Sequence, residues 1–172
     1  EPRLVVHYAS LDQDTSVFKV KDAYLNSDAD FHTTVSKMAD IPRDQAKTIN
    51  LGLFYGMGKA KLQAELGVSK DKAEELFAIY HQRVPFVKTL MKSVSNRAQQ
   101  RGQIRTLLGR LCRFHLWEPN RFGINKALPF EQAVQEHGQG NIRRAYTYKA
   151  LNKLIQGSAA DMTKKSMLDL YK

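Results

Sequence analysis

The sequence predicts a mainly helical domain that carries one small β-hairpin. Apolar residues recur at a helical period along most of the 172 residues, which is typical of helices that bury one face. The period changes only in QIRTLLGRLCRFHLW, at 103–117, where Leu111 and Arg113 alternate with Cys112 and Phe114 as in a strand. With 42% hydrophobic residues and a mean hydropathy of −0.47, the chain can bury a core, as one soluble domain or as a piece of a larger one.

Caps and breaks divide the first hundred residues into several expected helices. Asp and Ser side chains cap helix starts, Pro is common in the first turn, and Gly ends helices. The residues expected to begin or end these helices are Pro2, Asp30, Pro42, Gly56 with Gly58, Ser69, Val84-Pro85 and Gly102. The side chains expected on the apolar faces are Val17, Val20, Tyr24 and Leu25 in the second helix, and Leu76, Ile79 and Tyr80 in the helix after Ser69.

The rest of the chain is expected to form a hairpin, a loop and further helix. Leu108-Gly109 predicts the hairpin turn. Segment 118–134 contains Pro119, Gly123 and Pro129, so we expect a loop with little regular structure. From Asn141 onward the helical period returns, with a break or bend expected near Gln156-Gly157. Because neither end carries the expected start or cap, the chain is interpreted as a segment of a longer protein.

The charge distribution favours a polyanionic partner. Lys and Arg number 27 against 17 Asp and Glu, which gives a formal charge of +10. Solvated lysines are the plain alternative, but no acidic residue stands between Leu76 and Trp117. A block of one sign repels itself unless an anion neutralises it. The cations of this basic block are Arg83, Lys88, Lys92, Arg97, Arg101, Arg105, Arg110 and Arg113.

Cysteine, histidine and hydropathy patterns limit the class of protein. Cys112 is the single cysteine, which excludes an intramolecular disulfide framework, and the five histidines are not paired with cysteine as in a zinc site. No apolar run is long enough for a membrane span and no signal peptide opens the chain, so we expect an intracellular location, in a bacterial or host cytoplasm.

The stretch RDQAKTINLGLFYG, at 43–56, places four side chains along one helical stripe. Arg43, Lys47, Leu51 and Tyr55 stand four residues apart, which stacks them on one face. Arg43 and Lys47 add charge near a helix N-terminus, where anions are already favoured, while Leu51 and Tyr55 offer an apolar and a flat surface. The stripe therefore matches the phosphate, sugar and base of a nucleotide in order. A surface helix with a cationic edge and a core-facing Leu and Tyr is the alternative.

This stripe resembles the fingers-helix signature R-x3-K-x3-F/Y-x3-Y-G of family A DNA polymerases, the bacterial DNA polymerase I group. Three other stretches match motifs of that family in the same order. EPRLVVHYA at Glu1 resembles the tail of the palm motif that begins Asp-Tyr-Ser-Gln, DFHT at Asp30 resembles D-I-H-T, and NKLIQGSAADMTKKSM at Asn152 resembles N-x-x-x-Q-G-T-A-A-D. The resemblance covers nearly the whole chain.

The resemblance implies a nucleotide-binding role for five side chains and the residue at the chain start. By this resemblance His32, Arg43 and Lys47 hold the triphosphate of an incoming dNTP, and Lys47 is the general acid toward pyrophosphate. Leu51 is expected beside the sugar and Tyr55 beside the nascent base pair and the template base, and Arg43, Lys47 and Tyr55 are the expected catalytic residues. Glu1, otherwise read as a solvated charge, matches the residue that excludes ribonucleotides.

The resemblance also implies contacts with a DNA primer-template. Asn152 and Gln156, otherwise ordinary polar helix positions, match a pair that reaches the duplex minor groove, where every base pair presents acceptors. Arg110 in TLLGRLCRF resembles the T-x-x-G-R-R segment, with Leu111 in place of the second Arg, and we expect this hairpin to support the fold and the duplex backbone. Arg97 and Arg101 are assigned to duplex phosphates from the basic block. By the resemblance, 1–40 form palm-to-fingers helices, 41–102 the fingers, 103–136 a hairpin and loop, and 137–172 helices returning to the palm.

The chain departs from the family in three respects. Leu51 stands where the family has Phe or Tyr, which affects sugar discrimination, and Tyr148 stands where many bacterial members have Arg, which affects the grip on the primer strand. The family uses two Mg²⁺ ions held by two aspartates, and the matching positions fall outside this sequence, so no metal ligand is assigned here. Asp161 and Asp169 are interpreted as helix-surface or salt-bridge residues.

Three functional hypotheses follow. The first is a segment of a template-directed DNA polymerase that relies on the remaining palm and thumb segments and on Mg²⁺, and that is inactive in isolation. The second is a non-catalytic helical module that binds nucleic acid through the basic block. The third is one piece of a split polymerase whose partner segments supply the aspartates.

Overall fold

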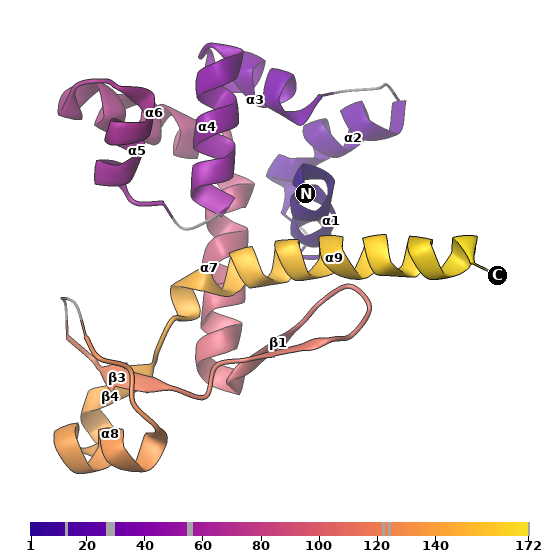
Figure 1. Cartoon of the computed structure of the whole chain (residues 1–172). Coiled ribbons are helices and arrows are strands. Elements are labelled where there is room, and N and C mark those ends of the chain that lie inside the picture. Colours follow the sequence, from indigo (N-terminus) through magenta and orange to yellow (C-terminus); the bar gives the residue numbers. More distant parts are fainter. Residues whose placement is uncertain (13, 27–29, 55–56, 122, 124, 172) are drawn as a thin grey trace. The chain divides into compact units, whose positions relative to one another are not determined.

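The computed structural model describes residues 1–12, 14–26, 30–54, 57–121, 123 and 125–171, and these fall into two compact units, 1–92 and 93–172. Both units contain mainly helix, and the second also contains two small antiparallel sheets (Figure 1). The predicted mainly helical class is therefore confirmed. Within the described ranges, none of the helices combines the length and apolar composition that a bilayer crossing needs.

The first unit is a set of helices separated by caps and turns. Its elements are α1 (Pro2–Leu11), the 3₁₀ turn η1 (Thr15–Val17), α2 (Phe18–Asn26), α3 (Phe31–Ala39), α4 (Arg43–Phe54), α5 (Lys59–Leu66), α6 (Lys70–Arg83) and α7 (Pro85–Arg101) as far as Lys92. The predicted caps are confirmed, because Asp30 accepts a hydrogen bond from the Thr33 amide and Ser69 accepts one from the Lys72 amide. The sequence pattern did not predict α5 as a separate helix.

Apolar faces of these helices meet in the core of the first unit. The largest fully buried side chains include Phe31, Ile49, Leu62, Tyr80 and Phe86. Val17 in η1 and Val20 in α2 are buried as expected, but Leu25 of α2 is 73% exposed, so its assignment to the buried side was wrong. The apolar stripe of this short helix is thus narrower than the sequence pattern indicated.

The second unit begins with the remainder of α7 and continues into a hairpin. Gly102, with φ of 68°, ends α7, and strands β1 (Gln103–Arg105) and β2 (Leu111–Arg113) then pair antiparallel with Ile104 opposite Cys112. Gly109 has φ of 86° in the turn, a conformation that glycine adopts without a steric penalty. The predicted hairpin is therefore confirmed.

The expected loop at 118–134 is wrong, because this region contains a strand and a helix. Strand β3 (Trp117–Pro119) pairs antiparallel with β4 (Ile142–Arg144), and α8 (Phe130–His137) lies between them in sequence. Pro129 precedes α8 rather than breaking it, which suits the fixed φ of proline at a helix start. The buried Ala133 and the Trp117–Phe130 ring contact, with centroids 5.0 Å apart, attach α8 to β3.

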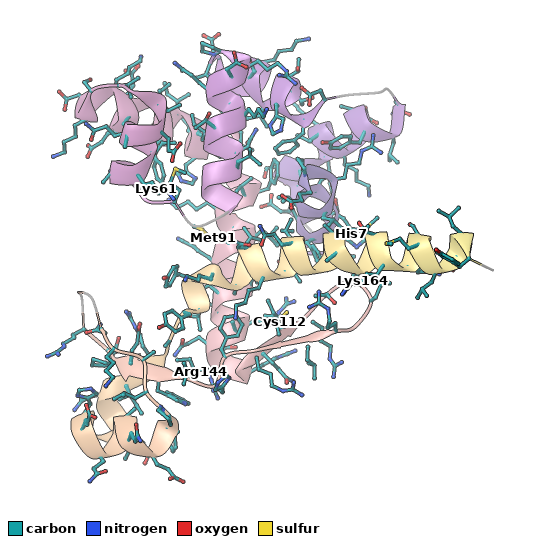
Figure 2. All side chains as sticks on the ribbon, in the orientation of Figure 1. His7, Lys61, Met91, Cys112, Arg144 and Lys164 are labelled. Atoms are coloured by element: carbon teal, nitrogen blue, oxygen red, sulfur yellow. The ribbon has the colours of Figure 1, made fainter. Side chains whose placement is uncertain are left out.

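Arg144 joins the β3–β4 sheet to the end of α7. Its guanidinium lies over the Trp117 ring at 4.5 Å and donates to the carbonyl oxygens of Gln99 and Phe114 at 3.2 and 3.0 Å (Figure 2). A Cβ at Gly102 would come within 2.7 Å of this guanidinium. Such charge-assisted bonds to backbone carbonyls fix the sheet on the helix.

The segment after Asn141 differs from its prediction in two ways. It begins with short turns and a strand rather than a helix, and the helix that follows has no break. Residues 139–141 form η2, 142–144 form β4 and 147–149 form η3, so the helical return expected from Asn141 begins only at α9 (Ala150–Leu170). Helix α9 runs without interruption through Gln156-Gly157, so the expected break there is wrong. Gly157 instead faces Thr106 and Arg110 of the hairpin, and Figure 1 shows α9 passing this hairpin.

Candidate functional site

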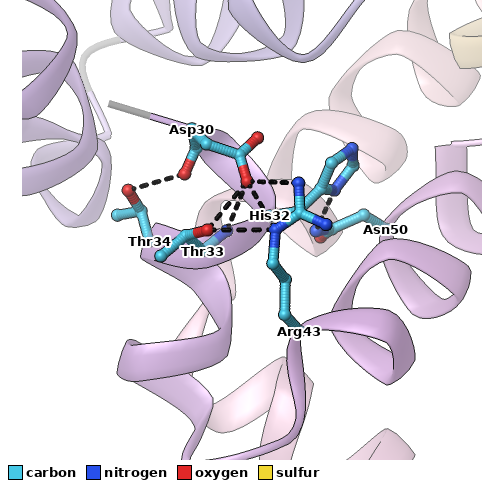
Figure 3. Close-up of polar contacts among 6 residues, drawn as sticks. All are labelled: Asp30, His32, Thr33, Thr34, Arg43 and Asn50. Atoms are coloured by element: carbon cyan, nitrogen blue, oxygen red, sulfur yellow. Dashed lines mark hydrogen bonds and ion pairs between the residues drawn. The ribbon is translucent and has the colours of Figure 1, made fainter. Parts of the chain in front are cut away.

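The start of α4 places Arg43 beside the start of α3. Arg43 donates through Nε to the Asp30 carboxylate at 3.0 Å and to the Thr33 hydroxyl at 3.1 Å, and its Nη2 lies 2.9 Å from Asp30 Oδ2 (Figure 3). The Thr33 hydroxyl and amide both donate to the same Asp30 oxygen. One carboxylate therefore caps α3 and orients the arginine at the N-terminus of α4.

The Asp30 carboxylate is held in its charged form. Its hydrogen bonds with the Thr33 hydroxyl, together with the Arg43 guanidinium, lower the pKa of Asp30 from 3.8 to about 2. The ion pair is still accessible, with side-chain exposures of 53% for Arg43 and 41% for Asp30. Exposed pairs of this kind contribute little net stability, so an incoming anion can compete for Arg43 without a large free-energy cost.

His32 follows Asp30 by two residues and contacts a buried polar pair. Its Nδ1 lies 3.1 Å from Asn50 Nδ2, and the Tyr80 hydroxyl donates to Asn50 Oδ1 at 2.5 Å. Asn50 and Tyr80 are both fully buried, whereas His32 is half-buried. The three residues come from α4, α6 and α3, so the histidine is held by contacts between three helices.

Burial and nearby cations favour the neutral form of His32. Desolvation is the largest cause of the lowered pKa of His32, and the charges of Arg43 and Lys47 lower it further, against an opposing effect of Asp30. A neutral imidazole carries one proton and can both donate and accept one hydrogen bond. His32 is therefore a polar contact for a ligand rather than a permanent positive charge.

Two further residues of the stripe, Lys47 and Leu51, lie on α4 as the sequence predicted. Lys47 is exposed one turn after Arg43, and Leu51 is half-buried one turn further. Tyr55, predicted beside the nascent base pair, lies outside the described residues, as does Gly56. Glu1 is the N-cap of α1, and its carbonyl accepts hydrogen bonds from the amides of Leu4 and Val5.

The predicted DNA-binding residues of the second unit lie on α7, the hairpin and α9. Arg97 and Arg101 are exposed on α7, four residues apart on one face. Asn152 and Gln156 are likewise four apart on α9, with Asn152 half-buried and Gln156 exposed. All eight cations of the basic block are exposed.

Arg110 anchors the hairpin to α9. It donates through Nε to Asp161 at 2.8 Å and through Nη2 to the Gly157 carbonyl at 2.9 Å. Asp161 also accepts a short hydrogen bond from the Thr106 hydroxyl, which is the leading cause of the lowered pKa of this carboxyl. Asp161 thus has the structural salt-bridge role that the sequence analysis favoured. Half of the Arg110 side chain remains exposed.

Two further residues of the QGSAAD segment contact the hairpin. Ser158 is buried and accepts a hydrogen bond from the Leu107 amide at 3.0 Å. Gly157 lets the hairpin approach, since a Cβ there would lie 2.8 Å from the Thr106 Cγ2. Gly157, Ser158 and Asp161 therefore all contact the hairpin. These contacts account for the glycine, the small hydroxyl and the acid in a motif that sequence comparison alone would assign to DNA contacts.

The described residues do not fit the two-metal centre that the resemblance implies. No group of three or more His, Cys, Asp or Glu side chains that could hold a metal ion occurs in the ranges the structure describes. The Asp161 carboxylate accepts a hydrogen bond from Thr106 and pairs with Arg110, and Asp169 pairs with Lys165 at 2.8 Å. Mg²⁺ ligation by other segments of a polymerase stays a prediction.

Asn50 and Tyr80 are site residues that sequence reasoning missed. They lie 30 residues apart in the chain and 18 or more from His32, so no local spacing connects them. The one available signal was an asparagine four residues after Ala46, on the buried face of α4. A buried amide of this kind requires partners, but the sequence does not name them.

The chain is similar in sequence to known DNA polymerases. The model of DNA polymerase family A matches residues 4–172. A DNA-directed DNA polymerase of Pseudomonas phage M6 is 33% identical over 98% of the chain and 28% of its own length, and DNA polymerase I of Bacillus caldotenax is 31% identical over 99% of the chain and 18% of its own length. The chain thus spans less than a third of these relatives.

A solved structure is similar in fold as well as in sequence. It is the POL domain of Pol1 from M. smegmatis in complex with DNA primer-template and dNTP, with a TM-score of 0.65 and 27% identity over 93% of this chain and 26% of that one.

Proposed function

Because the chain belongs to DNA polymerase family A, we propose that it binds the incoming dNTP and part of the primer-template during template-directed DNA synthesis. The observation that supports this most directly is the convergence of His32, Arg43 and Lys47 where α3 and α4 meet. Two cations and a neutral imidazole beside a helix N-terminus form a suitable site for a triphosphate.

Each of these side chains has a separate task in the proposed reaction. Arg43 holds phosphate oxygens with its planar guanidinium, and His32 donates one hydrogen bond. The primer 3′-hydroxyl gives its proton to solvent and forms a bond to the α-phosphorus, while the bond between that phosphorus and the oxygen bridging to the β-phosphate breaks and its electron pair stays on the leaving pyrophosphate. Lys47 gives its proton to the leaving pyrophosphate as general acid. Leu51, and Tyr55 outside the described residues, contact the sugar and the nascent base pair, and Glu1 excludes ribonucleotides.

The second unit is proposed to hold the duplex. Arg97 and Arg101, exposed on one face of α7, neutralise backbone phosphates, and Arg110 adds its exposed half to the same task. Asn152 and Gln156 reach minor-groove acceptors from α9. The remaining palm and thumb segments and Mg²⁺ are further partners in this proposal, since the chain spans only part of its relatives.

A nucleic-acid-binding module without catalysis is the second candidate, and the exposure of all eight cations of the basic block supports it. A lysine substitution separates the two candidates. The chain is placed in the matching segment of Bacillus caldotenax DNA polymerase I, and single-nucleotide incorporation is measured at saturating dNTP. Lys47→Ala should slow the chemical step by about 10² to 10⁴, the range for a lost general acid.

The matched control for this experiment is Lys61→Ala, which removes the same charge from the exposed face of α5 (Figure 2). It should leave incorporation unchanged. Arg43→Ala should mainly weaken dNTP binding. Wild-type rates for Lys47→Ala in an active chimera would reject the proton-donor role, and unchanged dNTP affinity in both variants would reject the triphosphate site and favour the binding module.

A further inference from the structure

We propose that Asn50 and Tyr80 are positioning residues that hold His32 as the tautomer with its proton on Nε2, the form that donates to a nucleotide phosphate. The contacts are those of a relay from the Tyr80 hydroxyl to the Asn50 amide and from that amide to the His32 ring. The identity of the ligand rests on the proposed function, whereas the state of the ring does not.

The direction of the relay follows from the Tyr80–Asn50 contact. A separation of 2.5 Å suits a hydroxyl that donates to a carbonyl oxygen, because N–H donors lie nearer 2.9 Å from their acceptors. The Asn50 atom beside Tyr80 is therefore Oδ1. The amide nitrogen then faces the His32 ring at 3.1 Å and brings a hydrogen with it.

The amide direction determines the tautomer of His32. Because Asn50 Nδ2 only donates, His32 Nδ1 must accept and cannot carry a proton. The single proton of the neutral ring is then on Nε2. Protonation of Nδ1 would set two N–H groups against each other, so the relay also opposes the imidazolium form.

Burial makes this arrangement difficult to rearrange. Asn50 and Tyr80 are both fully buried, and Tyr80 belongs to the core between α4 and α6. A buried amide that lost either partner would bear the cost of an unsatisfied polar group. The core therefore fixes the proton position of a half-buried ring at the site.

Several other charged groups surround His32. Asp30 at the cap of α3 favours protonation of the ring, while Arg43 and Lys47 on α4 oppose it. Tyr80 on α6 faces the ring through Asn50, and burial raises the pKa of its hydroxyl, so it stays a neutral donor. These surroundings favour the same neutral state that the relay requires.

The test is nitrogen NMR of the full chain with ¹⁵N-labelled histidine and no nucleotide. The ring signals report the tautomer and pKa of each of the five histidines, and His32→Gln identifies those of His32. The wild-type chain should show Nε2–H alone. Asn50→Asp replaces the donor with a nearly isosteric acceptor, so Nδ1 should become protonated and the pKa of His32 should rise by about 1–3. Tyr80→Phe releases the amide and should give a mixture of tautomers.

Ile49→Val is the control, because Ile49 is equally buried on α4 but lies outside the relay. Ile49→Val should lower the melting temperature by about as much as the relay variants do, but it should leave the tautomer and pKa of His32 unchanged. A wild-type ring with its proton on Nδ1 would overturn the proposal, as would an unchanged ring in Tyr80→Phe. Because the wild-type tautomer and Tyr80→Phe suffice, the proposal can be rejected even if Asn50→Asp does not fold.

Binding of dATP, measured by calorimetry on the same samples, separates this proposal from the proposed function. The expected ring states without dATP binding would support the relay and count against the nucleotide site. Binding of dATP that weakens in His32→Gln, with no tautomer change in the relay variants, would support the site and reject the relay.

Discussion

Gly157→Ala tests the contact between α9 and the β1–β2 hairpin. Gly157 stands inside a continuous helix, where Ala is normally favoured by about 1 kcal/mol. The added Cβ would lie 2.8 Å from Thr106 Cγ2 and 3.1 Å from Arg110 Nη2, whereas ordinary contact begins at 3.4 Å. The arginine end can move only by giving up its hydrogen bond to the Gly157 carbonyl. The Thr106 methyl is also fixed, because the hydroxyl of the same side chain is bonded to Asp161.

The expected result is a net loss of stability. Forcing a methyl into a packed contact costs about 1–3 kcal/mol, and the rigid threonine places this site in the upper part of that range. After the helix-propensity gain of about 1 kcal/mol, Gly157→Ala should destabilise the second unit by about 1–2 kcal/mol. The assay is urea unfolding followed by fluorescence of Trp117, the single tryptophan of the chain, which lies in this unit.

A double variant identifies the methyl as the cause. Thr106→Ser keeps the hydroxyl but removes Cγ2, so Gly157→Ala in the Thr106→Ser background should be neutral or stabilising. The coupling free energy should be about 1–3 kcal/mol. Gly140→Ala is the control, because a Cβ there has no heavy atom within 4 Å. Stabilisation by Gly157→Ala alone, or additive effects of the two substitutions, would refute the reasoning.

Three further predictions concern the charges and the third position of the stripe. The pKa of Asp30 is lowered to about 2, so this carboxylate stabilises α3 above pH 3.8, and the contribution is lost as pH falls toward 2. Asp30→Asn should therefore flatten the stability-against-pH curve in that window, measured by circular dichroism in urea. Charge reversal at Arg97 and Arg101 should reduce the log–log salt dependence of duplex binding by roughly 0.9 per lost phosphate contact, without changing sequence preference. In the chimeric polymerase, Leu51→Tyr should raise dideoxynucleotide incorporation relative to the matching dNTP by at least ~10-fold, about 1.4 kcal/mol, because its hydroxyl can replace the missing 3′-hydroxyl.

Each of these experiments has a matched control. Asp71→Asn, at an exposed aspartate in the first turn of α6, should leave the pH curve steep, and an equally steep curve for Asp30→Asn would contradict the linkage. Charge reversal at Lys61 and Lys70 should not alter the salt slope. If reversal at the two arginines of α7 also leaves it unchanged, these side chains face solvent rather than phosphates. An unchanged dideoxy ratio for Leu51→Tyr would mean that this position does not read the sugar.

Local patterns were enough to predict most helices and the hairpin. Asp30 and Ser69 cap helices with their own side chains, and Gly102 and Gly109 adopt positive φ angles that other residues avoid. These features depend on residues within a few positions of one another, so the sequence carries them directly. The motif resemblance, which needs only residue order, likewise identified the family.

The pairing of β3 with β4 depended on tertiary structure. Trp117 pairs with Arg144, and Glu118 with Arg143 through a 2.9 Å ion pair, across more than twenty residues. Strands β1 and β2 are joined by a tight turn that the sequence shows, whereas β3 and β4 are separated by more than twenty residues, and the proline and glycine between them suggested a loop. Only the contact with a distant strand determines that these residues are extended.

The sequence by itself therefore determined the helical class, the caps, the hairpin and the order of the cations along α4. The role of Gly157 depended on tertiary structure. Helix α9 continues through this residue, and glycine is needed there because the hairpin occupies the space that a side chain would take. Tertiary structure also decided that Asn50 faces His32 and Tyr80, since the three helices must pack before a buried amide finds its donors and acceptors. Short-range hydrogen bonds are encoded by neighbouring residues, whereas the satisfaction of buried polar groups is determined by packing.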